Sequence, residues 1–345
     1  MGNLTYKNLG LDKVNKALLS VLSKKNRDIM ERRFGLFGRK QRQTLEEIGG
    51  IYGITRERVR QIEEASLKKI KKSSAFAENQ KTVFAVKSEI EKTGGIVEEE
   101  KFLNDFSPNK SDRNHLVFLL RLIDEASYSR ADNKFKGYFT INPQFSEKIK
   151  EVLIGFGGEL QKENEVLGEK EIADKFGNFV KGKIAFLISK NVLISWLGLA
   201  NFIGKNQFGE WGPSSSIHIS PRGSRDFAYL ILKKENKPLH FREIAEKIER
   251  HFSRKAHFQT VHNELIKHPN FVLVGRGMYA LKDWGYKIGT VKEIIAGILK
   301  EKGPLPKEKI IDEVLKERFV KQDTILVNLQ NKERFKKQDD HYHLV

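Results

Sequence analysis

The chain has 345 residues and no cysteine, and its 63 Lys or Arg against 45 Asp or Glu give a formal net charge of +18. This length allows several domains, and the charge favours a polyanionic partner such as nucleic acid. The lack of cysteine excludes disulfides and Cys-ligated zinc, and the sequence shows no membrane-spanning run and no secretory leader, which predicts a cytoplasmic protein.

Residues 27–72 form the most informative stretch, after a helical lead-in over residues 1–23. Thr44 and Glu47 have the spacing of a capping box, which predicts a helix start. Gly53 allows a tight turn, and Thr55 can cap a second helix. The segment therefore predicts a helix-turn-helix. Residues 24–72 hold 15 basic and seven acidic residues, a net charge of +8.

The helix that follows Thr55 has two faces. Apolar or small side chains recur at spacings of three and four, at Val59, Ile62, Ser66 and Ile70. The opposite face is polar, and a solvated helix surface is its simplest explanation. Arg, Gln and Glu are also the side chains that read base edges in the major groove. We expect base contacts from four residues of this helix: Arg56, Glu57, Arg60 and Gln61. We expect phosphate contacts from Thr44, Arg58, Lys68 and Lys69.

Beyond a predicted linker at residues 73–80, the chain reads as repeated small units. Two C-terminal segments align, with Leu265, Phe271 and Tyr279 of the first matching Leu329, Phe335 and Tyr342 of the second. Each predicts a helix followed by a two-stranded wing with a turn, at Gly275–Gly277 and at Asp339–Asp340. A further helix pair with a Pro-containing turn precedes each one, at Pro238 and at Pro304. Such a unit is a winged helix.

Two weaker copies lie upstream, with predicted turns at Gly94–Gly95 and Gly157–Gly158. The predicted fold class is thus mostly α with small β wings, a helix-turn-helix domain followed by tandem winged-helix domains. The predicted domains are 1–78 (helix-turn-helix), 79–145 and 146–215 (possible winged helices), 222–287 and 288–345 (winged helices). We expect the junction between the last two, at residues 287–290, to be the first site that a protease cuts.

The segment from Arg33 to Glu63 closely resembles region 4 of the sigma-70 family of bacterial transcription initiation factors. It contains RFGL, TLEEIG and, after Gly53, ITRERVRQIE in the family's order. The resemblance implies that the second helix reads the promoter element upstream of the start site, with Arg56, Glu57 and Gln61 at the base-contacting positions. One departure is the basic linker at residues 37–43, which is often acidic in the family. We also expect no room before Asn26 for the family's promoter-melting domain.

Residues 223–286 resemble the HARE-HTH domains found in the delta subunit of bacterial RNA polymerase and in some chromatin and restriction proteins. The resemblance rests on LHFREIAEKI, TVHNELIKHPNF and VGRGMYALKDWGY. It implies a winged helix linked to transcription. Residues 222–287 are also basic, with a net charge of +7.

Searches for catalytic chemistry give no site. The sequence between His262 and His268 is not a zincin motif, and the glycine pairs lack a phosphate-loop ending. We therefore expect no enzymatic activity, metal, cofactor or small-molecule ligand. The expected function is a DNA-binding transcription factor that acts on promoter DNA in a bacterial cytoplasm, associated with the nucleoid and with the RNA polymerase core. Two alternatives remain open, a delta-like subunit of polymerase and the specificity subunit of a restriction-type system.

Overall fold

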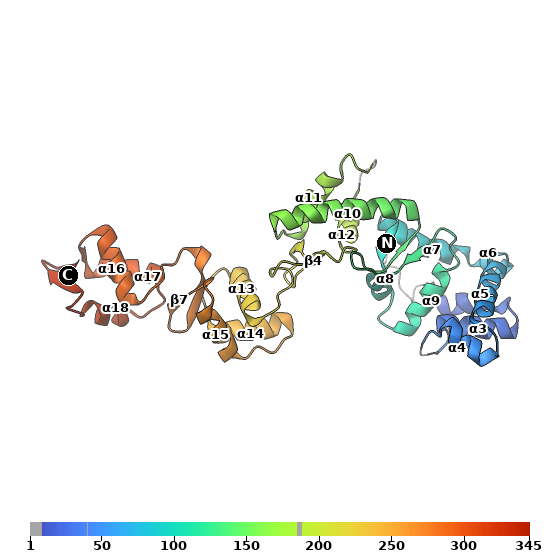
Figure 1. Ribbon diagram of the computed structural model, residues 1–345, viewed down its shortest axis with the longest axis horizontal. Helices are drawn as coiled ribbons and strands as arrows, with labels where there is room; N and C mark the ends of the chain where they lie inside the picture. The colour runs from blue at the N-terminus through green and yellow to red at the C-terminus, as the bar shows by residue number, and fades with distance from the viewer. Residues whose placement is uncertain (1–8, 40, 185–187) are drawn as a thin grey trace. The chain divides into compact units, whose positions relative to one another are not determined.

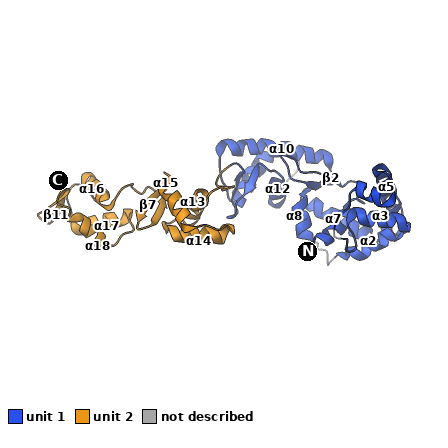
Figure 2. Cartoon of the chain, turned by 60° about the horizontal axis from the view of Figure 1, so that its bottom comes forward, with its two compact units in different colours: residues 1–215 blue, residues 216–345 orange. Residues whose placement is uncertain are grey.

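The computed structural model describes residues 9–39, 41–184 and 188–345 (Figure 1). Helices dominate, with small antiparallel sheets of two or three strands, so the predicted fold class is confirmed. The chain divides into two compact units, residues 1–215 and 216–345 (Figure 2). Among the described residues no helix is both long and apolar enough to cross a membrane.

The first unit begins with four helices: α2 (Leu11–Ser20), α3 (Lys24–Phe34), α4 (Leu45–Tyr52) and α5 (Arg56–Lys71). α2 is part of the core rather than a lead-in, because Leu11, Leu18 and Leu19 are buried on one of its faces. The expected linker at residues 73–80 is also wrong. Ser73 caps a short helix, α6 (Ser74–Glu78), and α7 begins at Gln80.

Six elements of the first unit then form a winged helix: α7 (Gln80–Lys92), β1 (Ile96–Glu98), α8 (Glu99–Phe106), α9 (Lys110–Leu120), β2 (Ser127–Ser129) and β3 (Tyr138–Thr140). The strand order is β1-β3-β2, with Thr140 opposite both Ile96 and Ser127. Gly94 and Gly95 lie in the turn before β1 and have positive φ angles, as expected for the turn predicted there.

A second set follows in the same order: α10 (Pro143–Glu163), α11 (Glu169–Val180), α12 (Lys190–Leu197), β4 (Ile203–Lys205) and β5 (Trp211–Pro213). The first strand is reduced to a bridge between Leu167 and Trp211. The turn predicted at Gly157–Gly158 is wrong, since both residues lie inside α10. A Cβ on Gly157 would collide with the Phe202 ring, so this glycine allows close packing.

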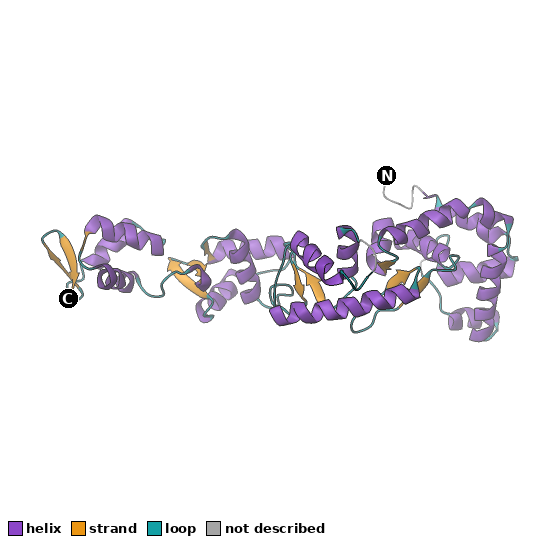
Figure 3. Cartoon of the chain, turned by 90° about the horizontal axis from the view of Figure 1, so that it is seen from above, coloured by secondary structure: helices purple, strands orange, loops and turns teal. Residues whose placement is uncertain are grey.

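The second unit contains two more winged helices (Figure 3). The first consists of α13 (Ser224–Glu235), β6 (Leu239–His240), α14 (Phe241–Phe252), α15 (Phe258–Lys267), β7 (Phe271–Gly275) and β8 (Met278–Leu281). The second consists of α16 (Val291–Lys302), β9 (Leu305–Pro306), α17 (Lys307–Glu317), α18 (Gln322–Leu329), β10 (Phe335–Gln338) and β11 (His341–Leu344). Both predicted wing turns are present, with positive φ at Gly277, Asp339 and Asp340.

These last two winged helices are joined by more than their linker. The Phe319 N–H donates to the Val274 carbonyl at 2.6 Å, so the end of β7 pairs with the segment after α17. Arg318, only 3% exposed, donates to the carbonyls of Lys287 and Gly289 at 2.5 and 2.9 Å. The junction at residues 287–289 is therefore held by the domain that follows it.

Candidate DNA interface

The turn between α4 and α5 is built as the sequence predicts. Thr44 and Glu47 form a reciprocal capping box, in which the Thr44 hydroxyl accepts from the Glu47 N–H at 3.2 Å and the Glu47 carboxylate accepts from the Thr44 N–H at 2.7 Å. Gly53 ends α4 in the left-handed conformation. Gly49 is also required, since a Cβ there would lie 2.6 Å from the Ile54 carbonyl. The two helices of the turn are thus set at close range.

The inner face of α5 anchors this helix in the domain. Thr55 caps it by accepting from the Arg58 N–H at 3.2 Å. Val59 packs with Ile29 of α3 and Ile48 of α4 in a small core. The predicted face is mostly confirmed, because Ser66 and Ile70 are also buried whereas Ile62 is only half-buried. This leaves the polar face of α5 toward solvent.

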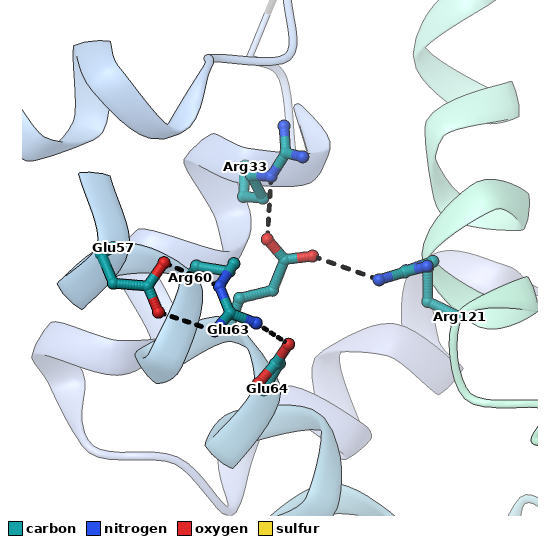
Figure 4. A network of polar contacts seen from close by, with 6 residues as sticks. All are labelled: Arg33, Glu57, Arg60, Glu63, Glu64 and Arg121. Atoms are coloured by element: carbon teal, nitrogen blue, oxygen red, sulfur yellow. Dashed lines mark hydrogen bonds and ion pairs between the residues drawn. The ribbon is translucent and has the colours of Figure 1, made fainter. Parts of the chain in front are cut away.

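The four predicted base-contacting residues are exposed on the first two turns of α5. Within that face Arg60 pairs with both Glu57 and Glu64, and its guanidinium is about half exposed (Figure 4). The hydrogen bond from Arg60 lowers the pKa of Glu57. Gln61 accepts a hydrogen bond from Arg58 at 3.0 Å. The arrangement offers Arg, Glu and Gln groups in the types that recognise bases, already ordered along one helix.

The predicted phosphate contacts are also exposed. Thr44 lies at the start of α4, Arg58 on the first turn of α5, and Lys68 and Lys69 near the end of α5. With 1.5 Å of rise per residue, the ten residues from Arg58 to Lys68 span about 15 Å of the helix. Lys71 differs, because it pairs with Asp124 of the first winged helix. Contacts of these residues with DNA stay predictions. Of the basic linker at residues 37–43, Lys40 lies outside the described residues.

One acidic residue of α5 points inward, and sequence patterning did not single it out. Glu63 is 6% exposed, and its carboxylate lies between Arg33 of α3 and Arg121 at the end of α9, at 2.9 and 3.8 Å (Figure 4). A buried carboxylate needs such partners to stay charged. The pairs tie α5 to the first winged helix, so α5 is held from two sides.

The third helix of a winged helix is the usual reader of DNA, but two of the four are covered. In α9, Asn114 donates to the Gly35 carbonyl at 3.0 Å, and His115 lies 3.0 Å from both Asn15 and Asp12 of the N-terminal helices. In α12, Trp196 donates to the Thr93 carbonyl of the first winged helix at 2.9 Å. Both helices therefore serve as packing surfaces between neighbouring domains.

By contrast, α15 exposes a polar face. Gln259, Thr260, Asn263 and Lys267 are exposed, and Gln259 lies 3.4 Å from Asn263. Beside them Phe241 stacks on His262, with ring centroids 4.3 Å apart, and Arg242 lies 5.2 Å from the centre of the Phe258 ring. Sequence reasoning identified this helix but not its reading face. Amides four residues apart before the buried Leu265 are the pattern that could have indicated it.

Comparison with known proteins agrees with both resemblances. Residues 18–72 match sigma-70 region 4, and residues 225–284 match HARE-HTH, a restriction endonuclease HTH domain. The chain is 54% identical over 56 residues to RNA polymerase sigma factor sigF, chloroplastic, of Arabidopsis thaliana, which covers 16% of this chain and 10% of that protein. It is 46% identical over 65 residues to RNA polymerase sigma factor SigA of Nostoc sp. (strain PCC 7120 / SAG 25.82 / UTEX 2576), covering 19% and 16%.

The matched segments span only about a tenth to a sixth of these relatives. The resemblance is therefore one of domains. Both matched domains are DNA-binding helix-turn-helix types linked to transcription, which confirms the coarse prediction of DNA as a partner.

Proposed function

We propose that this chain is a transcription factor that recognises upstream promoter DNA through α5 and acts in transcription initiation together with the RNA polymerase core. The observation that carries the proposal is the exposed face of Arg56, Glu57, Arg60 and Gln61 inside the segment that matches region 4. The basic charge around it supports binding to the DNA backbone. The site of action is the cytoplasm of a bacterial cell, at the nucleoid.

α15 is proposed as a second DNA contact. Its exposed amides at Gln259 and Asn263 suit adenine, which Gln and Asn bind through two hydrogen bonds. Two linked DNA contacts raise the overall affinity without any new type of interaction, because the second contact forms at high local concentration. We assign the chain no catalytic activity and no cofactor.

The proposal is tested with a promoter fragment, core polymerase and permanganate footprinting, which reports unpaired thymines. The region-4 resemblance implies recognition of the upstream element and not melting. We therefore expect a protected upstream element and no reactive thymines when this chain and core enzyme are combined. Opening by this pair alone would contradict the proposal and indicate a complete initiation factor. Equal affinity for promoter and random DNA would contradict the recognition role.

A further inference from the structure

A cavity of about 380 Å³ lies where the helix-turn-helix meets the first winged helix. Four arginines from four separate segments line it: Arg33 in α3, Arg42 before α4, Arg121 at the end of α9 and Arg130 after β2. We call these four residues the seam arginines. No single segment of the sequence contains this cluster, because folding brings the four segments together.

The seam arginines outnumber the carboxylates around them. Two acidic side chains line the same cavity, Glu63 and Glu99. Glu63 is shared between Arg33 and Arg121, as described above. Glu99 accepts a hydrogen bond from the Tyr128 hydroxyl at 2.6 Å. Burial and this bond to Glu99 raise the pKa of Tyr128 to about 12, so the phenol stays a neutral donor. Four guanidinium groups facing two carboxylates leave a surplus of two positive charges.

Part of this cluster is fixed in place. The Arg42 Nε donates to the Asn114 side-chain oxygen at 2.6 Å, and the Asn114 amide donates in turn to the Gly35 carbonyl at 3.0 Å. Arg33 is held by Glu63 and by the Gln43 carbonyl, at 2.9 and 3.2 Å. Groups that are oriented before binding lose less entropy when a ligand arrives. Guanidinium groups in particular match the oxygens of a phosphate through paired hydrogen bonds.

The cavity also lies beside the reading helix. Glu63 follows Arg60 by less than one turn of α5, and Arg42 precedes Thr44 by two residues. The major groove is about 12 Å wide, so a helix lying in it has a phosphate backbone along each flank. Phosphates on one flank are then within reach of long side chains that surround the helix.

We propose that the seam arginines bind a phosphate, and that its source is the backbone of the duplex read by α5. The first winged helix thereby contributes to DNA binding through Arg121 and Arg130 although its third helix, α9, is covered. This inference rests on the proposed function of α5. It extends the DNA contact beyond the segment that matches region 4.

The test compares two variants of the full chain that lose the same charge. The seam variant carries Arg121→Gln and Arg130→Gln, and the control carries Lys148→Gln and Lys162→Gln, which replace exposed lysines of α10. Affinity is measured on promoter and random duplexes over a range of salt concentrations. Each lost phosphate contact lowers the slope of log K against log salt by about 0.9. We expect a loss of about one to two in slope for the seam variant on both duplexes, and no change for the control.

A third variant, Arg121→Lys with Arg130→Lys, separates charge from damage to the fold. It should keep most of the slope, and thermal unfolding should show all three variants folded. An unchanged slope in the seam variant, with selective promoter binding retained, would overturn the seam site and leave the proposed function standing. If wild-type chain does not prefer the promoter, the proposed function fails instead. Saturable binding of inorganic pyrophosphate that only the seam variant loses, without a change in DNA slope, would overturn the DNA backbone as the source.

Discussion

Glu57 and Arg60 illustrate what a base contact has to replace. Arg60 is held by two carboxylates on its own helix, and both partners are about half exposed. Exposed pairs of this kind contribute little to stability. Exchanging one of them for a guanine or cytosine edge therefore costs little, and the helix arrives with its side chains already ordered.

Gln61 provides the sharpest test of direct base reading. Its amide is exposed, and its one described hydrogen bond, from Arg58, is also exposed. We expect Gln61→Ala to weaken binding to the preferred site by about 1–3 kcal/mol and to leave random DNA nearly unchanged. Lys68→Ala is the matched control and should weaken both duplexes equally. Equal losses on both duplexes for Gln61→Ala would show that this residue does not read sequence.

Asp28 predicts an acid-sensitive contact at the base of the domain. It accepts from Arg32 at 2.7 Å and also from Arg39 and Tyr52. Burial alone would raise the pKa of Asp28, but the hydrogen bonds from Tyr52 and Arg32 outweigh it and lower the pKa. A carboxyl with a lowered pKa stabilises the fold above its unfolded value of 3.8, and this stability is lost as the pH falls through the folded value.

Asp28→Asn should therefore lower the free energy of unfolding by about 1–2 kcal/mol near neutral pH, a figure reduced for the partial exposure of the pair. The difference from wild type should stay constant down to about pH 5 and shrink below about pH 4. Urea unfolding at a series of pH values measures it. Glu46→Gln, which removes an exposed carboxylate of α4, is the control. A difference that grows toward low pH would contradict the assignment.

At the scale of elements, α10 contains adjacent glycines with opposite roles. A Cβ on Gly157 would meet the Phe202 ring, whereas a Cβ on Gly158 would meet open space. Gly157→Ala should destabilise the second winged helix by about 1–3 kcal/mol through overpacking. Gly158→Ala should stabilise it by up to about 1 kcal/mol, since alanine favours helix. Urea unfolding followed by tryptophan fluorescence suits the test, because Trp196 and Trp211 lie in this core. Similar effects of both substitutions would contradict the packing role.

Local elements were predictable where neighbours in sequence determine them. Thr44, Glu47 and Gly53 define the turn of the helix-turn-helix through contacts within a few residues, and the sequence predicted that turn correctly. Glu63 could not be placed from periodicity, because its burial depends on arginines from α3 and α9. The error at Gly157 has the same origin: glycine favours a turn by default, but here the distant Phe202 ring requires its small size. The covering of α9 and α12 likewise depends on surfaces far away in sequence.

At the scale of the molecule, the second unit tests how far its two domains are coupled. Arg318 holds the carbonyls of Lys287 and Gly289, and the Lys287 N–H donates to Glu317 at 3.0 Å. The expectation of an open, easily cut junction at residues 287–290 therefore needs revision. Cleavage there requires local opening, and losing about 1.4 kcal/mol of closed-state stability raises the open population tenfold.

Arg318→Ala should accordingly speed tryptic cleavage after Lys287 by about tenfold or more, because a hydrogen bond from a charged group contributes about 1.5–3 kcal/mol. Mass spectrometry identifies the fragment that ends at Lys287. Arg250→Ala, at an exposed position of α14, should leave the rate unchanged. Rapid cleavage of the wild-type chain at this bond would show that the junction is open and the two domains independent.

The covered third helices also limit how selectively the first unit can choose a target. With α9 and α12 occupied by protein, α5 is the helix of residues 1–215 to which we assign base reading, and a mismatched base pair typically costs about 1–3 kcal/mol. A genome offers about 10⁶–10⁹ competing positions. The few base pairs that one short helix face can inspect occur by chance many times among them. A unique address must therefore combine α5 with information from elsewhere, either from α15 or from a partner already located at the promoter.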